Sequence, residues 1–221
     1  MNTGSRGSGV SNYIKIAGRA AHELAVYTRA HCMNQLPLLR DRIAPGVRVL
    51  FVGINPGVRS ALTGHHFAGF SNRFWKLLYE SRLVPEPIGY EDDTRLPEWG
   101  YGITNIVPRP TPGIDTLTRD EYVAGRRSLR RKILRHRPQV VAMVGVTVFR
   151  AMFPERRGPV TLGEQEERIG SSVVFVLPNP SGRNANYSYA EMLAAFVRLG
   201  SGLESTHFSR SGPARTGGAR S

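Results

Sequence analysis

The chain has 221 residues, of which 40% are apolar, and it carries a formal net charge of +13 at pH 7 with a single cysteine. This length is enough for one well-buried α/β domain with tails. No stretch reaches the continuous apolar length of a membrane span, and Met1–Ser11 lacks the apolar core of a secretory signal. The single cysteine, Cys32, excludes an internal disulfide, a four-thiolate zinc site and an iron–sulfur cluster. We therefore expect a cytoplasmic protein without a cysteine-bound metal.

The positive charge favours a polyanionic partner such as nucleic acid. Lysine occurs only at positions 15, 76 and 132, so nearly all basic residues are arginines, and genomic base composition is an alternative source of the charge. Basic residues are densest within residues 126–137, whereas acidic residues cluster at 91–93 and 164–167. Two interpretations of the basic segment stay open, a solvated helix face and a phosphate-contacting surface.

The chain divides into one ordered region between two polar ends. Residues 1–12 and 202–221 are rich in Gly, Ser and Arg and are expected to be disordered tails. Residues 13–43 predict an accessory helical segment whose helix ends near Pro37. The turn at Pro45-Gly46 then leads into the main domain, which we expect over residues 44–201.

Short apolar runs and helix signals alternate within this domain. Strands are predicted over residues 47–53, 102–107, 139–144 and 173–177. Ser71 is the predicted N-cap of a helix over 72–82, and a short helix is predicted over 145–153. Capping boxes at Thr118–Glu121 and Ser188–Glu191 predict helices that end near residues 137 and 199. This alternation predicts the α/β fold class, a three-layer α/β/α arrangement around a central, mainly parallel four-stranded sheet.

Two of the predicted strands are followed by an Asn-Pro pair, Asn55-Pro56 and Asn179-Pro180. Ligands of open α/β sheets bind beyond the carboxyl ends of the strands, so both asparagines are expected at one crevice. Asn55 lies between Gly53 and Gly57 and could orient a water, although an amide cannot deprotonate it strongly. The alternative is an ordinary turn between a strand and a helix, where Asn, Pro and Gly are common.

Other candidate residues have structural alternatives. Phe67 could belong to the core or present its ring to a ligand. His65 and His66 could act as a general base, but adjacent histidines in a polar loop are expected to be solvated. No His, Cys or Asp grouping has a recognisable ligand spacing, so we predict no metal site.

Several motifs occur in a fixed order along residues 44–200: Gly53–Gly57, Thr63-Gly64, Phe67-Ala68, Asn72–Trp75, Gly102–Thr111 and Asn179–Gly182. In this combination the chain resembles the mismatch-specific uracil/thymine-DNA glycosylase family of the uracil-DNA glycosylase superfamily. The resemblance implies a uracil-DNA glycosylase-like fold. It also implies a monofunctional enzyme, because no candidate lysine nucleophile lies in the motifs.

The resemblance assigns roles to individual residues. Asn55 would position the water that attacks the sugar, and Phe67 would stack on the extruded base. Ser60 matches a pocket position associated with uracil processing, Asn105 matches a variable polar pocket position, and backbone donors from Ile54 to Ser60 would bind the base carbonyls.

The last motif would serve the leaving base and the DNA. Asn179 stands where the superfamily often has a histidine that stabilises the departing uracil anion, so electrostatic help should be weaker here. Ser181 and Gly182 would begin the loop that enters the duplex. Arg183 would take the tip position, where bacterial relatives often carry an apolar residue.

These features predict a base-excision repair enzyme that hydrolyses the N-glycosidic bond of uracil flipped out of duplex DNA. Mismatched thymine and deaminated purines are open as further substrates. The expected partner is double-stranded DNA with uracil or a G:U or G:T mismatch, and we expect a monomer that needs no cofactor and no membrane. One alternative is a non-catalytic mismatch or damage binder of the same fold. Another is an α/β enzyme that uses the Gly-rich loop as a phosphate cradle, although the spacing fits neither a P-loop nor a dinucleotide fingerprint.

Overall fold

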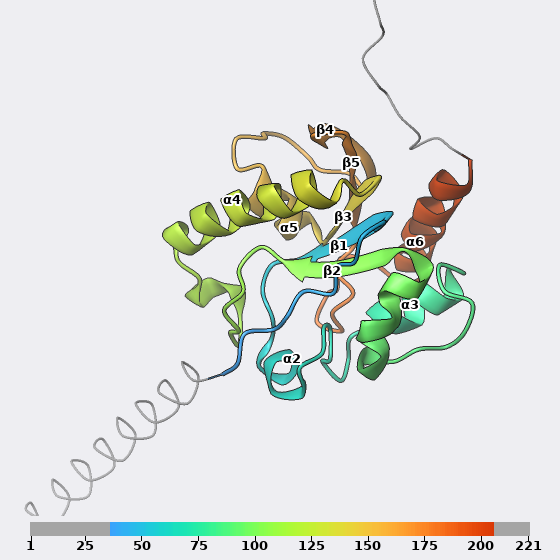
Figure 1. The fold of residues 1–221 in the computed structure, drawn as a ribbon, viewed down its shortest axis with the longest axis horizontal. Coiled ribbons are helices and arrows are strands. Elements are labelled where there is room, and N and C mark those ends of the chain that lie inside the picture. Colours follow the sequence, from blue (N-terminus) through green and yellow to red (C-terminus); the bar gives the residue numbers. More distant parts are fainter. Residues whose placement is uncertain (1–35, 206–221) are drawn as a thin grey trace, which may run out of the picture. The chain divides into compact units, whose positions relative to one another are not determined.

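The computed structural model describes residues 36–205, whose fold is shown in Figure 1. Within this range, residues 37–205 belong to one compact unit. The predicted tail over residues 1–12, the predicted accessory segment over 13–43 up to residue 35, and the predicted tail over 202–221 after residue 205 lie outside the described residues. Residues 36–43 contain no helix, and residues 202–204 belong to the last helix and not to a tail. Among the described residues, no helix has the length and apolar character needed to cross a membrane.

The sheet has five strands in the order β2-β1-β3-β5-β4. They are β1 (Val49–Gly53), β2 (Tyr101–Asn105), β3 (Val140–Val144), β4 (Gly163–Ile169) and β5 (Ser172–Leu177). The pairs β1–β2, β1–β3 and β3–β5 are parallel, and β4 pairs with β5 in the antiparallel sense. The predicted α/β class with a mainly parallel sheet is confirmed, with five strands in place of four.

The additional strand, β4, is a charged edge strand. Its sequence alternates between exposed or half-buried polar residues, and only the terminal Gly163 and Ile169 are buried. A two-residue turn at Gly170-Ser171, with Gly170 at a φ of 63°, connects it to β5. Charged residues are common on edge strands because they discourage pairing with other chains. The acidic residues at 164–167, noted in the sequence only as a charge cluster, therefore belong to this strand.

Five α-helices and two 3₁₀-helices lie between the described strands or follow the last of them. They are α2 (Val58–Thr63), α3 (Phe74–Glu80), η1 (Tyr90–Trp99), η2 (Ile114–Thr116), α4 (Arg119–His136), α5 (Val146–Met152) and α6 (Tyr189–Glu204). Both predicted capping boxes are confirmed, at Thr118 and Ser188. The prediction that Ser71 caps α3 is wrong: the helix begins at Phe74, whose N–H donates to Asn72 Oδ1 over 2.9 Å.

The helices cover both faces of the sheet, with α4 and α5 on one side and α3 and α6 on the other (Figure 1). Side chains of β1 alternate between the two layers. Val49 and Phe51 pack with residues of α3, η1 and α6, while Leu50 and Val52 pack with α4 and α5. Strands that are buried on both faces have near-continuous apolar sequences, which explains why the four apolar runs could be recognised. Because these strands carry few polar side chains, those that could bind a ligand come from the loops at the carboxyl ends of the strands.

Candidate active site

A cavity of about 290 Å³ lies among the loops that follow β1, β2, β3 and β5. Most of the residues singled out in the sequence line it: Ile54, Asn55, Ser60, Phe67, Asn105, Asn179 and Ser181. Arg183 instead lines a neighbouring cavity of about 340 Å³, which shares Asn179 and Ser181 with the first. The carboxyl ends of parallel strands meet at one edge of the sheet, so segments that are distant in sequence form one site.

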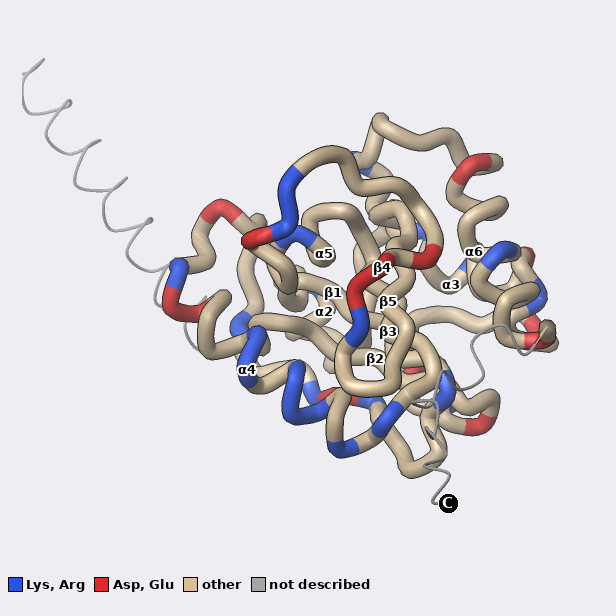
Figure 2. The backbone as a smooth tube through the Cα atoms, turned by 90° about the horizontal axis from the view of Figure 1, so that it is seen from above, with Lys and Arg blue, Asp and Glu red and all other residues tan. Residues whose placement is uncertain are grey.

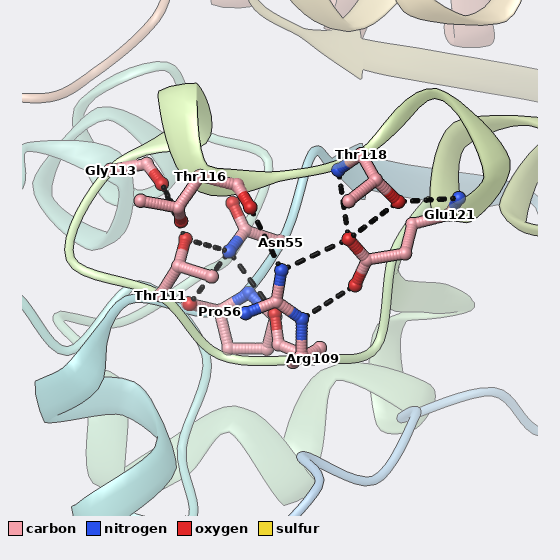
Figure 3. Close-up of polar contacts among 8 residues, drawn as sticks. All are labelled: Asn55, Pro56, Arg109, Thr111, Gly113, Thr116, Thr118 and Glu121. Carbon is pink, nitrogen blue, oxygen red and sulfur yellow. Dashed lines mark hydrogen bonds and ion pairs between the residues drawn. The ribbon is translucent and has the colours of Figure 1, made fainter. Parts of the chain in front are cut away.

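Hydrogen bonds fix the side-chain amide of Asn55 (Figure 3). Its Nδ2 donates to the carbonyl oxygens of Pro56 and Arg109, over 3.2 and 3.1 Å, and to Thr111 Oγ1 over 2.6 Å. The Thr111 hydroxyl itself donates to Gly113 O over 2.6 Å, so its oxygen is the acceptor toward Asn55. Because only an N–H₂ group can satisfy these acceptors, the orientation of the amide is determined. The Oδ1 atom has no partner within residues 36–205 and is left as an acceptor for a water or a ligand.

The loop that holds Asn55 is itself anchored to the start of α4. The Arg109 guanidinium binds both carboxylate oxygens of Glu121 and also donates to Thr116 O over 3.0 Å. Thr118 donates to the same carboxylate through its N–H over 2.8 Å and its hydroxyl over 3.1 Å. The hydrogen bond from Arg109 is the main cause that lowers the pKa of Glu121 to about 2. A carboxyl group with a lowered pKa stabilises the folded state above its ordinary pKa, and this stabilisation is lost only in acid. The carboxylate of Glu121 is therefore ionised at neutral pH.

Phe67 is a cavity residue with a strained backbone. It has a φ of 51°, a value that is rare for a bulky side chain and that accumulates at functional sites. Its ring stacks on Phe74, with centroids 4.3 Å apart and planes inclined by 30°. The next residue is held in place because the N–H of Ala68 donates to Ser60 Oγ over 3.1 Å. Phe67 thus contacts the core and lines the cavity at the same time.

The expectation that His65 and His66 are solvated is wrong for His66, whereas the side chain of His65 is 27% exposed. His66 is 2% exposed and lines the cavity, and the carboxylate of Asp93, which is 0% exposed, binds both residues. Asp93 accepts from His66 N–H over 2.9 Å and lies 3.0 Å from His65 Nδ1, and it also pairs with Arg42 Nε at 3.0 Å. The sequence contained no local signal for this contact, because Asp93 belongs to the acidic cluster at 91–93 and is distant from His66 along the chain.

The protonation of His66 bears on the orientation of the Asn105 amide. Burial is the main cause that lowers the pKa of His66, so the ring is neutral at physiological pH. Its Nε2 lies 3.0 Å from Arg40 O, which can only accept, so Nε2 carries the proton. The other nitrogen, Nδ1, is then an acceptor 3.5 Å from Asn105 Nδ2. The Oδ1 atom of Asn105 lies over Gly53, where a Cβ would approach it to 2.5 Å.

Asn179 is oriented in the opposite sense to Asn55. Its Oδ1 accepts from Ser181 N–H over 3.0 Å, and its backbone oxygen accepts from Asn184 Nδ2 over 2.8 Å. Its Nδ2 is therefore the group that is available to a ligand. The two asparagines thus offer an acceptor and a donor to one cavity.

The loop after Asn179 packs against the segment that precedes α3. Arg73 N–H donates to Pro180 O over 2.9 Å. A Cβ on Gly182 would lie 2.5 Å from Ser71 Cβ and 2.8 Å from Ser71 O, so only glycine fits this close approach. Both Gly182 and Arg183 are exposed.

Positive charge is concentrated outside the cavity. Figure 2 shows basic residues along α4, and exposed arginines occur there at positions 127, 130, 131 and 135. The cavity lining, in contrast, contains neither Arg, Lys, Asp nor Glu. Within residues 36–205 no group of three or more His, Cys, Asp or Glu side chains could hold a metal ion.

The family model described as the uracil DNA glycosylase superfamily matches residues 40–199 of the chain. The match covers most of the sequence and includes every strand and every residue that lines the cavity except Leu39. It agrees with the three-layer fold and with a site at the carboxyl ends of the strands. The chain therefore belongs to the uracil DNA glycosylase superfamily, whose members are DNA glycosylases.

Proposed function

We propose that this protein is a monofunctional glycosylase of the mismatch-specific uracil/thymine type, which hydrolyses the N-glycosidic bond of uracil flipped out of double-stranded DNA and leaves an abasic site. The fixed amide of Asn55 carries the proposal, because its Oδ1 is kept available at a cavity that Phe67 also lines. The cavity is small for a ligand site, as suits a single base.

The reaction requires the target nucleotide to leave the duplex. Extrusion costs a few kcal/mol and less at a mismatch. The ring of Phe67 would stack on the base, and backbone donors between Ile54 and Ser60 would bind its carbonyl oxygens. The loop from Ser181 to Arg183 would fill the space left in the duplex, while exposed arginines hold phosphates.

Bond breaking would precede the attack of water. An amide is too weak a base to deprotonate water, so the C–N bond would break first, with its electron pair leaving on the base and positive charge developing on the sugar. Asn55 Oδ1 would accept a hydrogen bond from the water and aim its oxygen at the anomeric carbon. The water adds to this carbon and loses a proton to solvent.

Stabilisation of the departing anion would come from neutral donors. Asn179 Nδ2 can donate to the leaving base because Asn179 Oδ1 is occupied by Ser181 N–H. His66, also in the wall, is kept neutral by burial and donates its one ring N–H to Arg40 O, so it offers the leaving base no donor. Hydrogen bonds from neutral donors to an anion are weaker than those from cations. The rate should therefore depend strongly on how stable the anion of the leaving base is by itself.

A panel of labelled duplexes tests the proposal. Uracil, thymine, hypoxanthine and 5-fluorouracil are placed opposite guanine, and alkali-labile sites are measured in single-turnover reactions. We expect cleavage at uracil, and faster cleavage at 5-fluorouracil because fluorine stabilises the departing anion. Retention of the duplex without abasic sites would identify a non-catalytic binder and contradict the proposal. Absence of both binding and cleavage would favour the phosphate-cradle alternative.

Removal of the Phe67 ring is expected to weaken capture of the flipped base. Stacking of a base on an aromatic ring is worth about 1–3 kcal/mol, so Phe67→Ala should raise the concentration needed for half-maximal single-turnover rate by about 5- to 150-fold. Phe67→Tyr should preserve the effect of stacking. Phe67→Leu is the control for packing against Phe74, and full activity in that variant would return Phe67 to a purely structural role.

A further inference from the structure

A second phenylalanine, Phe70, lies just outside the cavity and is 90% exposed. Residues on both sides of it in the sequence belong to the site, since Gly69 and Asn72 both line the cavity. Asn72 N–H donates to Gly69 O over 2.9 Å, so Phe70 is at the tip of a tight turn. The ring therefore lies at the rim of the cavity and is not part of its wall.

The ring of Phe70 is held from one side by Arg59. The guanidinium carbon of Arg59 lies 3.6 Å from the centroid of the Phe70 ring and 5.5 Å from that of Tyr90. Arg59 Nε donates to Ala68 O over 2.6 Å, and its Nη2 donates to Tyr90 OH over 3.2 Å. The guanidinium is thus fixed by two acceptors and stacks on one face of Phe70. The ring is oriented before any partner arrives, and its other face is open to solvent.

The same rim carries the loop that we propose for DNA. Ser71, the residue after Phe70, contacts Gly182 so closely that a Cβ there would lie 2.5 Å from Ser71 Cβ. Arg73 N–H donates to Pro180 O over 2.9 Å. The turn that carries Phe70 and the loop after Asn179 are therefore in direct contact, so a duplex bound at this loop would lie next to the turn.

An extruded nucleotide leaves neighbouring bases with uncovered faces. Such a face can stack on any aromatic side chain without regard to sequence. Arg59 beneath the ring adds positive charge, which favours a polyanion over an apolar protein surface as the partner. Phe70 has the exposure, the fixed orientation and the position for this contact. Phe67, three residues earlier, lines the cavity and stacks on the core residue Phe74.

We infer that Phe70, held by Arg59, is a stacking platform for an uncovered DNA base beside the flipped nucleotide. Phe67 and Phe70 then bind different bases, the first in the cavity and the second outside it. The identity of the ligand rests on the proposed function, whereas the platform itself is a feature of the described side chains.

The full-length protein and its variants test this inference by binding alone. Fluorescence anisotropy measures affinity for a duplex with one abasic site and for the matched intact duplex. Phe70→Ala and Phe70→Leu should each weaken binding to the abasic duplex by about 5- to 150-fold, and Phe70→Trp should retain it. With 2-aminopurine beside the abasic site, wild type and Phe70→Trp should quench its fluorescence, and Phe70→Leu should not.

Leu62→Ala is the matched control, because Leu62 is also a large exposed side chain, at 68% exposure, and lies outside the cavity lining. Its DNA affinity should equal that of wild type, and none of these variants should change the melting temperature. Normal affinity in Phe70→Leu would show that Phe70 makes a plain apolar contact and does not stack on a base. An equal loss of affinity for the intact duplex would indicate a contact with the DNA backbone. Either result overturns the inference. Failure of the wild type to excise any base would instead overturn the proposed function and leave this binding result standing.

Discussion

Replacement of Asn55 with alanine is expected to lower the single-turnover rate of base release by about 10²-fold or more. The variant loses the only side-chain atom that we assign to the attacking water, and the Thr111 and Arg109 acceptors lose their donor. Affinity for a uracil-containing duplex should change little, because Asn55 makes no contact that we assign to the base or to phosphate. Rapid-quench measurements at saturating enzyme separate the two quantities.

Asn55→Asp is the sharper comparison. Aspartate has the same shape, but it would place an anionic oxygen against the carbonyl oxygens of Pro56 and Arg109, where Nδ2 now donates. This repulsion should displace the side chain, so we expect the variant to be slower than wild type at neutral pH. A single-turnover rate in Asn55→Ala that equals the wild-type rate would refute the role of the residue. Wild-type activity in Asn55→Asp would refute the anchoring of its amide.

Loss of the buried carboxylate of Asp93 is expected to reduce the free energy of unfolding by about 3 kcal/mol or more. Asp93→Ala would leave Arg42, whose side chain is 19% exposed, without its ion-pair partner. It would also remove the acceptor of the His66 N–H, which precedes the strained backbone of Phe67. Urea denaturation measures the loss, and excision should fall together with it because the loop that carries Phe67 is released.

Asp92→Ala provides the matched control on the same 3₁₀-helix. Asp92 is 37% exposed in its side chain, and its carboxylate accepts from Gly89 N–H at the start of that helix. Its loss should cost about 1 kcal/mol, as for other helix caps. A similar small cost in Asp93→Ala would mean that the buried carboxylate does not hold the cavity loop, and the structural role given to it here would be wrong.

The parts of the fold that could be predicted are those with a local signal. Strands buried on both faces have continuous apolar sequences, and the helix starts at Thr118 and Ser188 have capping residues three positions apart. The strand β4 has no such signal, because exposed and half-buried polar residues alternate along it and it contains no apolar run. Ser71 has the chemistry of a cap, but the helix begins at Phe74, whose N–H donates to the side chain of Asn72 and not to Ser71.

The candidate site could be predicted as a set of positions but not as a set of contacts. The resemblance assigned Asn55, Phe67 and Asn105, and all three line the cavity. The partners that orient them, among them Asp93 and Thr111, come from distant segments and have ordinary sequence surroundings. Nor does sequence distinguish Phe67 from Phe70: the first turns inward with a left-handed backbone, and the second is exposed. Such differences depend on tertiary packing, which no local pattern encodes.

The position of β1 in the sheet has a consequence for biosynthesis. It is the first of the described strands to leave the ribosome, yet it lies between β2 and β3 and pairs with both. Its apolar side chains stay unpaired until both of these strands have been translated, which exposes a nascent chain to aggregation. The loop that carries Asn179 comes still later, after β5. A ribosome-bound chain with Asn55 already made therefore lacks the other wall of its cavity until the residues after β5 have been translated.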